Sequence, residues 1–177
     1  MIRRSLGMFL FIAACGTFAA PLAHAATSGT ATVTLAAAAQ AAIQILDPAV
    51  TLSPTATDYD NDYIEAAGAA GLRVRVRSNS SSGMTLSVRC SDAAPEIPLD
   101  DLLVRTQTAA GAGGTTMSSY TAITASDQTL WTSTVAENGW RTVTTDVRVQ
   151  NLISFDDDAG AGTTDYTNTL TYTVAVQ

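Results

Sequence analysis

Residues 72–90 read LRVRVRSNSSSGMTLSVRC, and this stretch decides the fold class. Apolar residues occupy every second position on either side of a polar cluster, SNSSSG, at 78–83. A period of two puts alternate side chains on opposite faces of a β-strand, and serine, asparagine and glycine are typical of turns. The stretch therefore predicts two amphipathic strands, 72–77 and 84–90, paired as an antiparallel hairpin.

Shorter alternating runs, separated by turn residues, continue through the rest of the chain. They predict strands at 30–35, 41–46, 50–52, 99–106, 119–123, 129–135, 140–149 and 166–177, where 99–106 is either a strand throughout or one helical turn followed by a strand. One run of alanines, 36–42, favours either a short helix or an extension of the first strand. Many short strands within one domain's length are typical of an all-β, antiparallel Ig-like β-sandwich, with a closed barrel as the alternative.

The first 25 residues have the features of a secretory signal peptide. A positively charged start precedes an apolar run at 6–20, and AHA at 23–25 has the small-x-small pattern of a cleavage site. The apolar run is too short for a membrane span. We therefore expect one mature domain over 26–177, which is secreted, periplasmic or at the surface of a bacterium. A lipid anchor at Cys15 is the alternative.

The predicted mature domain is acidic and lacks residues on which many enzymes depend. It contains all sixteen Asp and Glu but only seven Arg and no Lys, which gives a formal charge of −9. Its composition disfavours nucleic acid as a partner. The only histidine, His24, belongs to the predicted signal peptide, so histidine-based triads and histidine-ligated zinc are excluded. We expect no enzymatic activity and no catalytic residue.

Arg73, Arg75 and Arg77 share one face of the strand predicted at 72–77. Alternate residues of a strand are about 7 Å apart, so the three guanidinium groups form a ladder. Such a ladder suits an acidic partner, a sugar acid or a phosphate. It is equally typical of the solvent face of a sheet on which neighbouring strands supply Asp or Glu.

Two acidic clusters have the oxygen-rich composition of a calcium site. The first lies in DYDNDY at 58–63, where the acids alternate as the first ligands of a calcium loop do, although tyrosine replaces the usual glycine. If the two loops meet at one end of the sandwich, they can share a Ca²⁺ ion. Otherwise, the clusters are acidic turns that keep the domain in solution. The clusters consist of Asp58, Asp60 and Asp62, and of Asp156, Asp157 and Asp158.

Cys90 is the one cysteine of the predicted mature domain, which therefore has no internal disulfide. It is in phase with the apolar residues of 84–88, and this predicts a buried core thiol, with an intermolecular disulfide as the alternative. Trp131 and Trp140 are expected either as core anchors or as exposed rings for sugar stacking.

The two ends of the predicted mature domain carry a further pattern. Ala31, Val33 and Leu35 alternate near its start, and TLTYTVAVQ at 169–177 follows an Asp-Tyr-Thr run. In this layout the chain resembles the secreted pilin-like β-sandwich proteins of Gram-negative bacteria, which include spore coat protein U-like and chaperone–usher subunits. The resemblance implies assembly by β-strand addition, in which the N-terminal segment of one subunit fills a groove of the next. It implies that Val33 and Leu35 fill the groove and that the C-terminal strand, with Leu170, Tyr172, Val174 and Val176, is the edge offered to a chaperone.

These observations together predict a secreted, non-enzymatic structural or adhesive surface protein, a fimbrial-type subunit that associates with itself or with a periplasmic chaperone. The alternative is a monomeric extracellular module that binds carbohydrate or protein with the help of calcium. The two differ in the segment 30–35, which pairs with another chain in the first and with its own sheet in the second.

Overall fold

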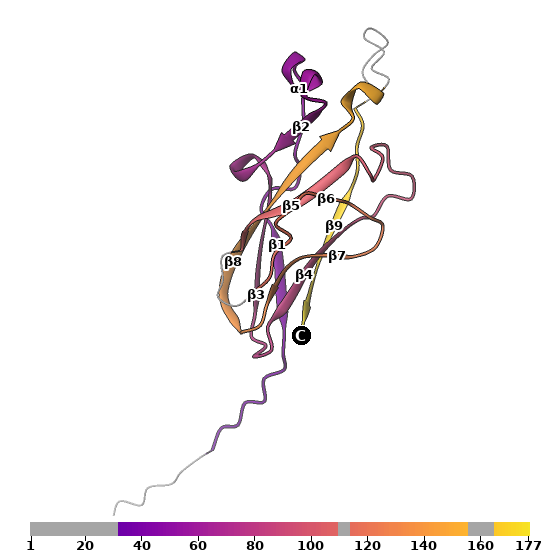
Figure 1. Cartoon of the computed structure of the whole chain (residues 1–177). Coiled ribbons are helices and arrows are strands. Elements are labelled where there is room, and N and C mark those ends of the chain that lie inside the picture. The colour runs from indigo at the N-terminus through magenta and orange to yellow at the C-terminus, as the bar shows by residue number, and fades with distance from the viewer. Residues whose placement is uncertain (1–31, 110–113, 156–164) are drawn as a thin grey trace, which may run out of the picture. The chain divides into compact units, whose positions relative to one another are not determined.

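The computed structural model describes residues 32–109, 114–155 and 165–177. The chain divides into two units, residues 1–36 and 37–177. The second unit is an antiparallel β-sandwich made of two sheets (Figure 1). The predicted signal peptide and Cys15 lie outside the described residues.

The larger sheet is built around one long strand, β8 (Glu137–Gln150). One edge of β8 pairs first with β3 and then with β2, and its other edge pairs with β5. The strand order is β1-β3-β8-β5-β6, with β2 beside the C-terminal half of β8. These strands are β1 (Ala41–Ile45), β2 (Tyr63–Ala66), β3 (Leu72–Ser78), β5 (Leu102–Ala109) and β6 (Thr121–Ala122).

The smaller sheet has the strand order β7-β4-β9 among the described residues. Its strands are β7 (Gln128–Ser133), β4 (Met84–Cys90) and β9 (Leu170–Val176). The connections carry the helix α1 (Ala56–Asn61) and two short 3₁₀ turns, η1 (Gly68–Ala70) and η2 (Leu152–Ser154). No helix of the described residues is long and apolar enough to cross a membrane.

The core lies between the two sheets and is formed by the apolar face of each strand. Val74 and Val76 of β3, and Met84, Leu86 and Val88 of β4, are all completely buried. Their removal from water contributes about 1.5–3 kcal/mol for each side chain. The alternation seen at 72–90 therefore predicted correctly which side chains form the core.

The predicted hairpin of residues 72–90 is wrong in its pairing. Both strands form, but β3 pairs with β1 and β8, whereas β4 pairs with β7 and β9. The link at 79–83 therefore carries the chain from one sheet to the other. Crossing between the sheets lets both apolar faces point into one core, whereas a hairpin would have placed them side by side in the same sheet.

The crossing link depends on Gly83. Its φ is +90°, a left-handed conformation that favours glycine. A Cβ built on this residue would lie 1.8 Å from the carbonyl oxygen of Ser133, so a side chain cannot fit there. The link thus holds β4 tightly against the end of β7.

Three local predictions also differ from the structure. Residues 32–40 form neither strand nor helix, and residues 50–52 form no strand. The alanine run begins β1 at Ala41 and forms no helix, because Asn79 holds residues 38–40 extended: its side chain donates to the Ala38 carbonyl and accepts from the Gln40 amide. Conversely, α1 was not predicted; Thr55 and Asp58 form a capping box that starts it.

Candidate functional site

The first candidate site is the free edge of β9. This strand pairs with β4 along all of Leu170–Val176, and no strand of the described ranges pairs with its other edge. On such an edge, alternate residues direct their N–H and C=O groups away from the sheet. The edge can therefore accept the backbone of one more strand.

The side chains of β9 show the effect of this missing neighbour. Its inward-facing residues, from Leu170 to Val176, are in register with the completely buried residues of β4. They are themselves only partly buried, and Val176 is 40% exposed. The difference arises because β4 is flanked by strands on both sides and β9 on one side only.

The strand order locates this gap within a known architecture. In chain order, β1, β3, β4, β5, β8 and β9 occupy the places of strands A to F of a constant-type Ig sandwich, whose sheets are ABED and CFG. In that architecture, strand G pairs with strand F. Strand F corresponds to β9 here, and the edge of β9 on which strand G would lie is unpaired among the described residues. The two sheets have their edge strands β1 and β9 close together on this side, without hydrogen bonds between them.

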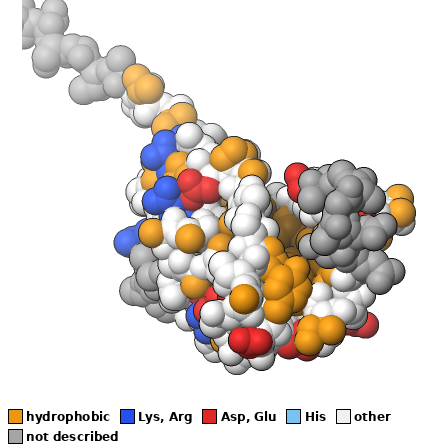
Figure 2. Space-filling model, turned by 90° about the horizontal axis from the view of Figure 1, so that it is seen from above, with side chains coloured by type: hydrophobic (Ala, Val, Ile, Leu, Met, Phe, Trp, Pro, Cys, Tyr) orange, Lys and Arg blue, Asp and Glu red, His pale blue; other side chains and the backbone are white. Residues whose placement is uncertain are grey.

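Apolar side chains are exposed on the same side of the sandwich. Ile45, at the end of β1, is 44% exposed, and Ile43, Leu170, Tyr172 and Val174 are only partly covered. Figure 2 views the molecule from above and shows hydrophobic side chains beside a hollow on that face. The surface that β1 and β9 leave uncovered therefore includes apolar side chains of both strands.

The segment predicted to fill such a gap, 31–35, has exposed apolar side chains where it is described. Val33 and Leu35 are 93% and 87% exposed, and Ala31 lies outside the described residues. Exposed apolar side chains at alternate positions are what a donor strand requires, because they would share one face once the segment is extended.

The second candidate site is the outer face of the larger sheet, where five arginines gather. They come from β3, β5 and β8: Arg73, Arg75, Arg77, Arg105 and Arg148. Three of the five make an ion pair with a carboxylate, as the solvent-face interpretation predicts. The pairs are Arg73–Asp47, Arg105–Asp146 and Arg148–Glu65.

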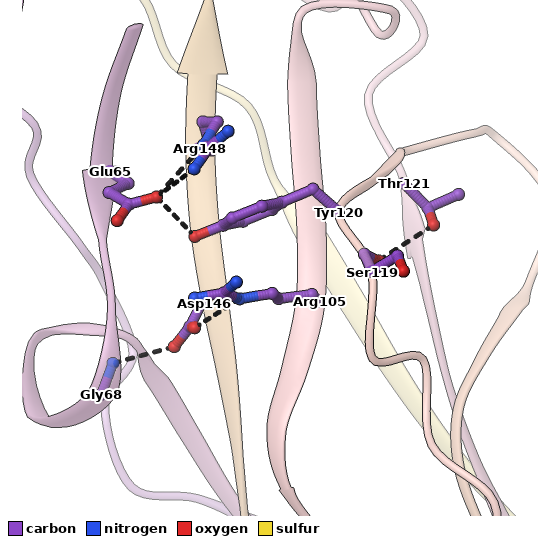
Figure 3. Close-up of polar contacts among 8 residues, drawn as sticks. All are labelled: Glu65, Gly68, Arg105, Ser119, Tyr120, Thr121, Asp146 and Arg148. Carbon is purple, nitrogen blue, oxygen red and sulfur yellow. Dashed lines mark hydrogen bonds and ion pairs between the residues drawn. The ribbon is translucent and has the colours of Figure 1, made fainter.

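Two of these ion pairs share the ring of Tyr120 (Figure 3). The guanidinium carbons of Arg105 and Arg148 lie 4.3 and 4.0 Å from the ring centroid. The Tyr120 hydroxyl donates to Glu65, which also accepts from Arg148. The hydrogen bond from Arg148 holds the pKa of Glu65 below its usual value, while burial, and then Glu65, raise the pKa of Tyr120 to about 12.

Asp146 is the buried member of this cluster, with no exposed side-chain surface. It accepts 2.8 Å hydrogen bonds from Arg105 Nε and from the backbone N–H of Gly68 (Figure 3). One carboxylate therefore ties β5, β8 and η1 together. This role is structural, because both oxygens of Asp146 are used within the fold.

Arg75 and Arg77 form a different arrangement around Trp140. Their guanidinium carbons lie 4.9 and 4.6 Å from the Trp140 ring, which is 37% exposed. Arg75 donates twice to the Gln44 side-chain oxygen. Neither arginine has a carboxylate partner among the described residues. The predicted ladder is therefore split: Arg73 is neutralised, while Arg75 and Arg77 are not.

The predicted calcium residues have other roles where they are described. Asp58 accepts from the Thr55 backbone and hydroxyl in the capping box, and these hydrogen bonds lower its pKa. Asp60 lies in α1, and Asp62 ends the helix with a left-handed backbone. Asp156, Asp157 and Asp158 lie outside the described residues. Within the described ranges, no three Asp, Glu, His or Cys residues are grouped as a metal site would need.

Cys90 is buried at the end of β4, as its phase predicted. Its thiol lies 3.7 Å from a carboxylate oxygen of Asp92, which also accepts from the Thr169 amide. The hydrogen bonds from Thr169 lower the pKa of Asp92. Cys90 thus belongs to the packing that holds the start of β9.

Comparison of the chain with protein-family models, with curated proteins and with solved structures found no match. Sequence reasoning did not predict that Tyr120 and Glu65 belong to the arginine face, since they are distant in the chain, Glu65 in the short strand β2 and Tyr120 in the loop before β6. It also did not predict that Trp140 contacts Arg75 and Arg77. A signal was present, because Trp140 is out of phase with the apolar residues of β8 and is therefore expected to point outward.

Proposed function

We propose that this chain is a non-enzymatic structural protein of the cell surface whose copies join by β-strand addition at the free edge of β9. The observation that carries the proposal is the unpaired edge itself, with apolar side chains left half-covered beside it. A strand added there would receive backbone hydrogen bonds and would cover the residues that β9 and β1 leave exposed.

The donor in this proposal is the segment 31–35 of a second copy. Val33 and Leu35 would face the core, and each would gain about 1.5–3 kcal/mol from burial. Thr32 and Thr34 would face outward, which suits the solvent side of a sandwich. The pattern of the donor thus matches what the acceptor edge lacks.

The proposal is tested by the native mass of the exported full chain, measured by size-exclusion chromatography with light scattering. We expect wild-type protein to form ladders or filaments, and V33D/L35D protein to remain a folded monomer. Thr34→Asp is the matched control, because it adds the same charge on the opposite face of the donor and should preserve assembly. A monomeric wild type, or assembly that survives V33D/L35D, would contradict the proposal.

A mixing experiment identifies the acceptor. Val174→Asp places a charge on the inward face of β9 and should block the acceptor while leaving the donor intact. The V174D chain and the V33D/L35D chain should each be monomeric alone, and they should form a one-to-one dimer when mixed. If mixing yields no dimer although both chains are folded by circular dichroism, the edge of β9 is not the acceptor.

A further inference from the structure

On the outer face of the larger sheet, arginine side chains lie over aromatic rings. Two of these arginines also pair with a carboxylate, and a third does not. Arg105 and Arg148 stack a guanidinium face on Tyr120, and each directs its N–H edge to a carboxylate of the chain. An arginine can use both surfaces at once, since stacking involves the plane and ion pairing involves the edge. A stacked arginine that has no carboxylate partner in the chain can therefore still bind a carboxylate with its N–H edge.

Arg77 is this third arginine. It is exposed, lies over Trp140 at 4.6 Å and makes no hydrogen bond or ion pair with the described residues. Arg75 adds a second positive charge on the same ring, with part of its edge occupied by Gln44. In a chain with many more carboxylates than arginines, two unneutralised guanidinium groups held by one tryptophan form an anion-binding surface.

A shallow hollow adjoins Arg77 and indicates what kind of anion fits. It has a volume of about 240 Å³, and its lining includes Gln40, Ser78, Asn79 and Asn138. This volume is smaller than that of sites for drug-sized ligands and suits a group of monosaccharide size. The side-chain amides of Gln40 and Asn138 make no hydrogen bond with the described residues, so both can pair with hydroxyl groups of a ligand.

We propose that Arg77, Arg75 and Trp140, together with the amides of Gln40 and Asn138, bind the uronic-acid unit of an acidic polysaccharide. The carboxylate pairs with the free edge of Arg77, and the sugar hydroxyls pair with the two amides. An acidic peptide would use the same guanidinium but has few hydroxyl groups to match the amide-lined hollow. The site lies on the larger sheet, whereas the β9 edge belongs to the smaller sheet, so this proposal does not depend on strand addition.

The test uses the full chain and a linear trimer of galacturonic acid, titrated by calorimetry and by the NMR shift of the indole N–H of Trp140. We expect saturable binding of the trimer and no saturation with its methyl ester, which keeps the hydroxyls but removes the charge. Arg77→Gln should weaken binding at least about tenfold, the loss expected for one charge-assisted hydrogen bond. The matched control is Arg89→Gln, an exposed β4 arginine only 3.6 Å from Asp127, which should leave binding unchanged.

Asn138→Ala distinguishes a sugar from an acidic protein. It should weaken binding of the trimer several-fold and leave any binding of short poly-glutamate unchanged. The proposal is overturned if the wild type fails to bind the trimer at millimolar concentration, or if R77Q protein of unchanged melting temperature binds it as the wild type does. Equal affinity for poly-glutamate, with no effect of N138A on the trimer, would overturn it in favour of an acidic protein partner.

Discussion

Replacing Asp146 by alanine tests whether this buried carboxylate connects the larger sheet. The substitution removes the acceptor of two 2.8 Å hydrogen bonds, one from Arg105 and one from the backbone of Gly68. Removing one partner of a buried ion pair costs about 3–5 kcal/mol, because the other is left uncompensated. Arg105 is 30% exposed and can be rehydrated, so we expect the lower end, about 3 kcal/mol.

The assay is equilibrium unfolding in urea, followed by tryptophan fluorescence under conditions in which the chain is monomeric, so that unfolding is not coupled to association. A loss of about 3 kcal/mol corresponds to a fall in melting temperature of roughly 6–12 °C for a domain of this size. The matched control is Glu65→Ala, which breaks an ion pair whose two side chains are 27% and 33% exposed. It should cost about 1 kcal/mol or less.

The control also has a defined pH dependence. The hydrogen bond from Arg148 lowers the pKa of Glu65 in the folded state from the usual 4.5. The stability contributed by Glu65 is therefore present above about pH 4.5 and is lost as the pH falls through the lowered value. The difference between wild type and E65A should shrink on acidification. A cost of D146A no greater than that of E65A at neutral pH would refute the assigned role of Asp146.

Two further predictions concern the edge strand and the link between the sheets. Burial raises the pKa of Tyr172 to about 12, so its contribution to stability is present below pH 10 and is lost as the pH rises from 10 to 12. Tyr172→Phe should remove this contribution, so that urea midpoints measured at pH 9 and 11.5 differ less than they do for the wild type. A comparable alkaline loss remains from Tyr120, whose pKa is also raised to about 12, and a Y172F curve parallel to wild type would show that burial of the hydroxyl is not the cause. Gly83→Ala should destabilise the fold by more than about 2 kcal/mol, because the new Cβ meets the Ser133 carbonyl at a positive φ. Gly139→Ala is its control, since nothing lies within 4 Å of a Cβ there, and equal melting temperatures of the two variants would contradict the stated cause.

The alternation of residues 72–90 was sufficient to predict two strands and their buried faces. Period two is a local property: once a residue is in a strand, its neighbours in sequence settle which face it occupies. The same reasoning correctly placed Cys90 in the core and Arg73, Arg75 and Arg77 on the outer face. It did not predict α1, because a helix of 6 residues, fewer than two turns, is too short to show a 3.6-residue period.

The sequence by itself therefore determined the fold class, the core-facing residues and the solvent-facing arginines, since these depend on side-chain alternation along one strand. The tertiary structure decided which strands are neighbours: it separated β3 from β4, left one edge of β9 unpaired, and brought Trp140 to Arg75 and Arg77. Pairing between strands depends on how the chain crosses between layers, and the five-residue link at 79–83 allows either a hairpin or a crossing. The choice is made by burial of both apolar faces in one core, which is a property of the whole domain and of no single segment.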